Sequence, residues 1–99
     1  MLRVLRPALL ASAILGTCYV PQTQAALISC HPYGRAITAH KTLPRGTRVR
    51  FYNSYASVVA TVGDRGPYKG KREFDIDCGL MRQLHIDGVG YVNTQILGR

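Results

Sequence analysis

The sequence is short of acidic residues and cysteines, and it has no long apolar run. Only 5 Asp and Glu accompany 13 Lys and Arg, which leaves a formal net charge of +8. The 3 cysteines form no CxxC pair and the 3 histidines no HxxxH motif, so neither a metal site nor a cofactor is expected. At 99 residues the chain is also too short for a large multidomain enzyme.

What the sequence does contain is typical of a packed domain. Hydrophobic residues make up 46% and charged residues 18%, a balance that favours a folded chain over a disordered one. The excess of positive charge predicts an anionic partner. Nucleic acid, a membrane surface and a cell-wall polymer all qualify, and charge alone does not choose among them.

The N-terminal segment has the pattern of an export signal. Residues 1–6 are basic, and residues 8–20 are mostly Ala, Leu, Ile and Val. This mostly apolar run of 13 residues is shorter than the roughly 20 residues of a membrane-spanning helix. A basic start, a short apolar core and then small residues are typical of a secretory signal, with cleavage expected after Ala25 or Ala26. The alternative is an amphipathic helix that belongs to the domain.

Export as a lipid-anchored protein is an alternative to export with a cleaved secretory signal. The run Leu15-Gly16-Thr17-Cys18 is similar to a lipobox, in which Cys18 would be lipidated and become the mature N-terminus. Thr17 fits poorly, because Gly, Ala or Ser usually precedes the cysteine. The sequence therefore predicts periplasmic or extracellular localisation, with membrane attachment only if Cys18 is lipidated.

Removal of residues 1–26 leaves a domain over residues 27–99 whose cysteines are Cys30 and Cys78. An even pair in an oxidising compartment predicts a disulfide, and two free thiols are the alternative. A bridge that closes a loop of about 49 residues would stabilise the fold by roughly 4 kcal/mol from chain entropy. The charge of this domain stays near +6, since 2 of the 13 basic residues leave and all 5 acidic ones remain.

Short apolar runs separated by Pro and Gly turns predict a mainly β fold. The expected strands cover residues 27–30, 37–40, 47–52, 57–62, 74–77 and 90–97. Apolar spacing over residues 79–86 predicts one short helix. Five or six short strands with one helix are typical of a small closed barrel.

Three motifs then follow in a specific order. Residues 38–50 read TAHKTLPRGTRVR, residues 63–68 read GDRGPY, and residues 74–77 read FDID with Leu80 and Leu84 after them. They resemble the TAAHKTLPxGTRVRV, NDRGPF and IDLSxAAAxxLG patterns of the RlpA-like double-psi β-barrel family, whose named members are septal-ring lytic transglycosylases. The resemblance implies a six-stranded double-psi β-barrel with one or two short helices. Expansin-like and barwin-like domains share this fold, so the fold alone does not name the substrate.

The resemblance implies peptidoglycan as the substrate and Asp64 as the catalytic acid. Asp64 lies in a Gly-flanked loop, where the backbone can approach a ligand. In a lytic transglycosylase one carboxyl protonates the oxygen of the MurNAc–GlcNAc linkage and then takes the proton of the sugar's own 6-hydroxyl. The product is a 1,6-anhydro ring, and no water is consumed, unlike in ordinary glycoside hydrolysis with paired carboxylates. The alternative is that Asp64 only holds its loop.

The other candidate site residues are cationic, aromatic or structural. His40 matches the histidine of the motif and could donate to a sugar hydroxyl or orient Asp64, or else bond a backbone carbonyl. Basic side chains would attract the carboxylates of the wall, and tyrosine rings would stack on sugars. The expected substrate-binding residues are His40, Arg65, Tyr68, Lys41 and Tyr33. Asp75 is expected to be structural, as an N-cap or a loop tie.

One part of the family's pattern is missing. Active members carry acidic residues ahead of the TAAH motif, in a pattern such as GExFD, whereas no carboxylate lies between Leu27 and Val62. The alternative function is therefore a non-catalytic glycan-binding barrel of the expansin or barwin type. A secreted effector that uses only the scaffold is a third possibility, and export makes nucleic acid an unexpected partner.

Overall fold

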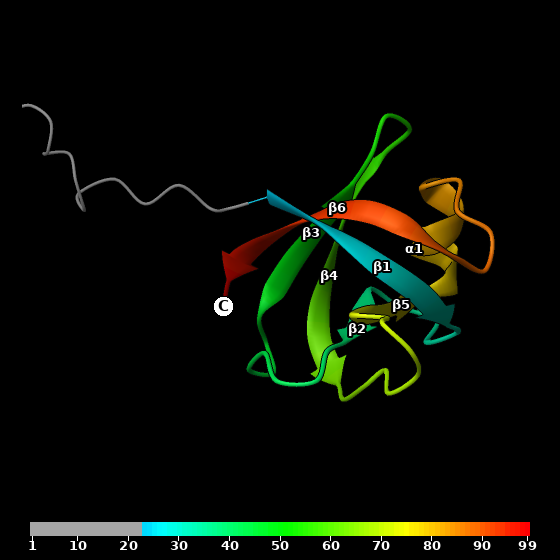
Figure 1. Cartoon of the computed structure of the whole chain (residues 1–99). Coiled ribbons are helices and arrows are strands. Elements are labelled where there is room, and N and C mark those ends of the chain that lie inside the picture. Colours follow the sequence, from blue (N-terminus) through cyan, green and yellow to red (C-terminus); the bar gives the residue numbers. More distant parts are fainter. Residues whose placement is uncertain (1–22) are drawn as a thin grey trace, which may run out of the picture.

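A computed structural model describes residues 23–99, which form a closed six-stranded barrel (Figure 1). The strands are β1 (Thr23–His31), β2 (Ile37–Ala39), β3 (Arg48–Tyr52), β4 (Ser57–Asp64), β5 (Phe74–Asp77) and β6 (Val89–Gly98). The helix α1 (Cys78–Gln83) lies between β5 and β6 in the chain. The expected mainly β barrel with a short helix is confirmed.

The strand order around the barrel is β1-β5-β2-β4-β3-β6, and β6 closes it against β1. Two neighbouring pairs, β1 with β5 and β2 with β4, are parallel, and the other pairs are antiparallel. Parallel neighbours need a crossover connection, so strands far apart in the sequence become adjacent. In the β2–β5 pair Ala39 lies opposite Asp75. This register brings the chain that leaves β2 beside the chain that enters β5.

The barrel interior is filled by alternate side chains along the strands, those that point inward. On β3, Val49 and Phe51 are fully buried, while Arg48, the first residue of the strand, is exposed. The Phe51 ring meets the Phe74 ring edge-on, with centroids 5.1 Å apart. This period-two pattern is what a half-buried strand produces. The buried apolar residues that pack together as the core are Ala26, Ile28, Val49, Phe51, Val58, Ala60, Val62, Phe74, Ile76, Met81, Leu84 and Val92.

A disulfide and a capping carboxylate fix the helix to the barrel. Cys30, on β1, is bonded to Cys78, the first residue of α1, as expected. The Asp77 carboxylate accepts hydrogen bonds from the backbone N–H of Gly79 at 3.0 Å and of Gly34 at 2.8 Å. Asp77 thus caps the helix and also holds the loop after β1.

The N-cap role considered for Asp75 is wrong, because α1 begins at Cys78 and Asp77 occupies the cap position. Asp75 lies on β5 and its carboxylate accepts a hydrogen bond from the Ser29 hydroxyl, directly opposite on β1. Its role is that of a tie between two parallel strands. The structural role expected for Asp75 stays a prediction, and this contact with Ser29 is the one that supports it.

Two element boundaries differ from those expected by more than two residues. Strand β1 begins at Thr23, four residues before the expected start, and Thr23–Ala26 pairs with Val92–Gln95 of β6. Cleavage after Ala26 would remove this paired stretch, including the buried side chain of Ala26. Helix α1 ends at Gln83 rather than residue 86, because His85 adopts a positive φ of 59° and reverses the chain.

The apolar part of the expected signal and the lipobox cysteine Cys18 lie outside the described residues. The export signal, its cleavage site and the lipid anchor stay predictions. Within residues 23–99, no helix has the length and apolar character needed to cross a membrane.

Candidate functional site

His40 directly follows β2 and caps the next turn with its ring. Its Nδ1 atom accepts hydrogen bonds from the backbone N–H of Thr42 at 3.1 Å and of Leu43 at 3.0 Å. A nitrogen that accepts two such bonds carries no proton, so the neutral ring holds its proton on Nε2. Burial lowers the pKa of His40, which favours the same neutral form. One role expected for His40 was a hydrogen bond to a backbone carbonyl. In the structure its ring instead accepts hydrogen bonds from backbone N–H groups.

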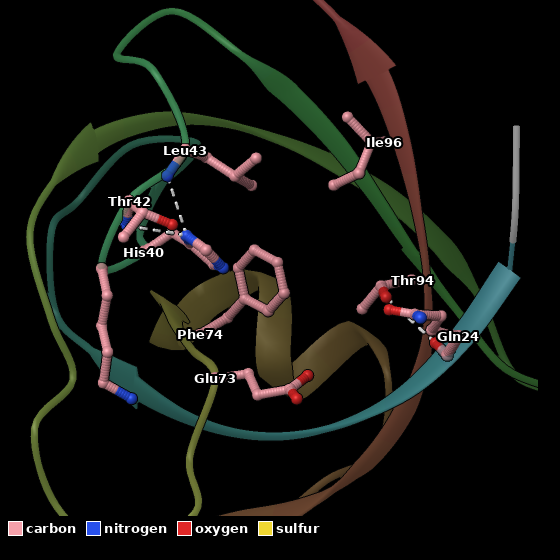
Figure 2. Close-up of a pocket in the computed structure, with 9 residues that line it drawn as sticks. Gln24, His40, Thr42, Leu43, Glu73, Phe74, Thr94 and Ile96 are labelled. Atoms are coloured by element: carbon pink, nitrogen blue, oxygen red, sulfur yellow. Dashed lines mark hydrogen bonds between the residues drawn. The ribbon is translucent and has the colours of Figure 1, made fainter.

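A cleft of about 290 Å³ opens beside this turn (Figure 2). Leu43, Phe74 and Ile96 supply its apolar wall, and Gln24 and Thr94 supply uncharged polar groups. The Thr94 hydroxyl donates to the Gln24 carbonyl at 3.0 Å, which joins β6 to β1 at the rim. An apolar wall with a few polar groups suits a ligand that has one apolar face and hydroxyls around its edge.

Three ionisable side chains line the same cleft: His40, Lys41 and Glu73. The His40 ring packs on Phe74 with centroids 4.8 Å apart, so its position relative to the cleft is fixed. The Lys41 ammonium donates to the Arg72 carbonyl at 3.3 Å. Glu73 is the one acidic residue among those that line the cleft within residues 23–99.

Asp64 ends β4 and lies outside the lining of the cleft. One carboxylate oxygen accepts from the backbone N–H of Arg65 at 2.8 Å, and the other accepts from the Tyr33 hydroxyl at 2.9 Å. These two bonds, that from Arg65 first, lower the pKa of Asp64. Asp64 is therefore a solvent-exposed, ionised carboxylate at neutral pH. Burial of the phenol and the bond to Asp64 together raise the pKa of Tyr33, which stays protonated.

Arg65 connects Asp64, at the end of β4, to the His40–Leu43 turn beside the cleft. Its guanidinium donates to the carbonyl of Leu43 at 2.7 Å and to that of His40 at 3.2 Å. The backbone N–H of His40 donates in turn to the Asp64 carbonyl at 3.2 Å. Arg65, expected to bind substrate, thus braces the turn that forms one side of the cleft. Tyr68 lies on the following loop and its side chain is 73% exposed.

Two curated proteins are similar to this chain in sequence. It is 44% identical over 63 residues to a probable endolytic peptidoglycan transglycosylase RlpA from Synechocystis sp., and 43% identical over 65 residues to a protein of the same name from Nostoc sp.. The alignments cover 60% and 62% of this chain but 20% and 18% of those proteins, so the chain spans about a fifth of the length of its relatives. No family model matches the chain.

A solved structure identifies the barrel type. The crystal structure of the computationally designed msDPBB_sym2 protein, a double-psi β-barrel, matches with a TM-score of 0.62. The match covers 77% of this chain and 100% of the designed one at 20% sequence identity, so it shows the fold alone. The chain is an RlpA-like double-psi β-barrel. The expected family and fold are confirmed.

The RlpA-like barrel brings together most of the residues singled out from its motifs. His40 and Lys41 line the cleft, while Tyr33, Asp64 and Arg65 form a hydrogen-bonded group that is bonded to the turn after β2 and lies outside the lining. The loop after β1, which lacks a carboxylate, contributes the phenol of Tyr33 to this group. Within residues 23–99 no three His, Cys, Asp or Glu side chains gather in a way that could hold a metal ion.

Glu73 is the functional candidate that sequence reasoning missed. It follows the basic stretch of residues 69–72 and matches none of the three family motifs. The cleft is built from the rim of β1, the turn after β2, the start of β5, and β6, so no local spacing marks its members. One signal was available in the sequence, since Glu73 is its single glutamate and directly precedes the FDID motif.

Proposed function

We propose that this barrel acts on the glycan strands of peptidoglycan as a lytic transglycosylase, cleaving the MurNAc–GlcNAc linkage with formation of a 1,6-anhydro product. The observation that carries the proposal is the cleft beside His40, in a chain 44% identical over 63 residues to a probable peptidoglycan transglycosylase. An apolar ring face of a sugar can pack on Phe74 and Leu43. Its hydroxyls can then meet Gln24, Thr94 and the Nε2–H of His40.

The reaction needs two proton transfers. The C1–O bond breaks as a proton reaches the leaving oxygen, and the 6-hydroxyl oxygen of the same sugar attacks C1 and loses its own proton. Asp64 is the carboxylate that the GDRGPY motif assigns to this chemistry. Its lowered pKa keeps it ionised, which suits the group that accepts the 6-hydroxyl proton rather than the group that donates one.

The charge of the barrel supports an anionic polymer as its partner. Lys41 at the cleft and the exposed Lys69 and Lys71 on the loop before β5 are available to the carboxylates of peptide stems. Attraction of this kind raises the rate of encounter more than it fixes the position of the sugar. We place the chain in the cell envelope, exported by its N-terminal segment or anchored through Cys18.

A non-catalytic glycan-binding barrel is the second candidate. Two observations favour it: no carboxylate lies between Leu27 and Val62, and the carboxylate of Asp64 is held ionised outside the cleft. Such a protein would use the same cleft and the same basic residues. It would bind the wall and release nothing from it.

Digestion of purified sacculi separates the two candidates. The full chain is produced with its own N-terminal segment, recovered from the envelope fraction, and incubated with sacculi. Soluble products are analysed by mass spectrometry for 1,6-anhydro muropeptides, and bound protein is measured in the pellet. A transglycosylase releases these products, and Asp64→Asn releases fewer. If wild type and Asp64→Asn both pellet with sacculi but release none, the binding module is the function.

A further inference from the structure

The one carboxylate that lines the cleft, that of Glu73, lies outside all three family motifs. Of the 5 acidic residues in the sequence, Glu73 alone lines the cleft, and it does so next to the His40–Leu43 turn that carries the TAHKTLP motif. Figure 2 shows its side chain extending beneath the Phe74 ring, on the side of Gln24 and Thr94. A sugar ring in the cleft would therefore contact this carboxyl group.

The backbone holds Glu73 in place while its carboxyl stays available. The N–H of Glu73 donates to the Leu27 carbonyl of β1 at 2.8 Å, and Phe74, the first residue of β5, is fixed in the core. The Glu73 side chain itself is exposed. Among residues 23–99, none donates a hydrogen bond to its carboxyl oxygens.

Three of the other acidic residues have carboxylates that accept hydrogen bonds from the protein. Asp75 accepts from the Ser29 hydroxyl, and Asp77 caps α1. Asp64 accepts from Tyr33 and from the backbone of Arg65. A group that donates a proton to a bound ligand must be within hydrogen-bond reach of that ligand and free to carry the proton. By these two geometric criteria Glu73 is the best-placed carboxyl.

We propose that Glu73 contacts the glycan in this cleft and donates the proton to the glycosidic oxygen, in place of the acid that is absent ahead of β2. The carboxyl O–H bond breaks and an O–H bond forms on the leaving sugar as the C1–O bond breaks. The 6-hydroxyl oxygen bonds to C1, and its proton passes through water to the Asp64 carboxylate, which lies outside the lining of the cleft. Exchange with water returns both carboxyls to their starting states. The donor step rests on the function proposed above.

The test compares Glu73→Gln with wild type and with Asp87→Asn. Asp87 is an exposed acid in the turn after α1, outside the lining of the cleft, so its variant controls for the loss of one negative charge. Release of 1,6-anhydro muropeptides and pelleting with sacculi are measured for all three. In a second measurement each protein is titrated with the N-acetylglucosamine tetramer, and the amide signals of Thr42 and Thr94 are followed by NMR.

If Glu73 is the donor, Glu73→Gln releases product at least about 100-fold more slowly than wild type, while Asp87→Asn does not differ from wild type. A Glu73→Gln protein that cleaves as fast as an active wild type overturns the donor role and leaves the transglycosylase function standing.

A wild type that releases no product overturns the transglycosylase function, and the donor step with it. In that case the NMR titration alone tests whether Glu73 contacts the glycan. Shifts of Thr42 and Thr94 that weaken several-fold in Glu73→Gln, and not in Asp87→Asn, establish Glu73 as a glycan contact. Equal shifts in both variants, or none in wild type, overturn the contact as well.

Discussion

The Tyr33 hydroxyl donates a 2.9 Å hydrogen bond to the Asp64 carboxylate, which joins the loop after β1 to the end of β4. In the family pattern the segment that contains Tyr33 carries acids, and here it presents a phenol to the acid of the GDRGPY motif. This contact helps to keep Asp64 ionised. In the proposed reaction this contact therefore favours Asp64 as the group that accepts a proton.

Substitution of Tyr33 by Phe should raise the pKa of Asp64 toward its ordinary value. The variant removes a donor to the charged form of the carboxylate and keeps the ring, while the stronger bond from the Arg65 backbone remains. A titration of the carboxyl carbon signal of Asp64 by NMR measures this pKa. Tyr68→Phe is the control, because Tyr68 is 73% exposed and makes no hydrogen bond to Asp64. An unchanged pKa in Tyr33→Phe would contradict the account.

The lowered pKa of Asp64 also predicts a pH dependence of stability. Because the folded-state pKa lies below the unfolded-state value of about 3.9, the charged carboxylate stabilises the fold above that value. This contribution is lost as the pH falls through the folded-state pKa. The free energy of unfolding of wild type should exceed that of Asp64→Asn by a small, constant amount at neutral pH, small because the group is exposed. The difference should vanish in acid, and a difference that grows there would be inconsistent with the contacts of Asp64.

Loss of the Cys30–Cys78 disulfide should destabilise the barrel by about 2–5 kcal/mol. The bridge closes a loop with a sequence separation of 48 residues, so its removal gives the unfolded chain much more freedom. Urea unfolding of the paired Cys30→Ser, Cys78→Ser variant against oxidised wild type measures the cost. Reduced wild type should unfold like the double variant. Equal midpoints for oxidised and reduced wild type would show that the bridge contributes nothing.

The start of β1 can be tested by shortening the chain. A chain that begins at Leu27 lacks four residues of β1 that pair with β6, among them the buried Ala26. It should be less stable than a chain that begins at Thr23 by at least about 1 kcal/mol, given the net value of each lost hydrogen bond. Equilibrium urea denaturation of the two chains measures the difference. Equal stabilities would mean that residues 23–26 add nothing to the barrel.

Most of the strands could be predicted from the sequence because their signals are local. Alternation at Val49 and Phe51 marks β3, and the β-branched run that begins at Ser57 marks β4. The sequence pattern extends the helix to residue 86, beyond its true end. The helix stops earlier because His85 has a positive φ, a conformation that sequence marks clearly only at glycine. The expected β1 is too short because the Thr23–Ala26 stretch resembles a cleavage site. Its pairing with β6 involves residues about 70 positions away, which a local pattern does not reveal.

The site was only partly predictable, for a similar reason. Motif matches singled out His40 and Asp64, and the structure places them at the ends of the paired strands β2 and β4, where a backbone hydrogen bond joins them. The motif matches could not show that Arg65 is used to hold the turn, or that Asp64 lies outside the cleft. Glu73 is brought to the cleft by the pairing of β5 with β2 and with β1, which links positions more than 30 residues apart. Such a contact follows from topology and not from local pattern.

The central claim is that the barrel cleaves glycan strands, and the release of 1,6-anhydro muropeptides from purified sacculi tests it most directly. The account predicts that wild type releases these products, and that Glu73→Gln still pellets with sacculi but releases at least about 100-fold less. A wild-type protein that binds sacculi and releases none would contradict the claim.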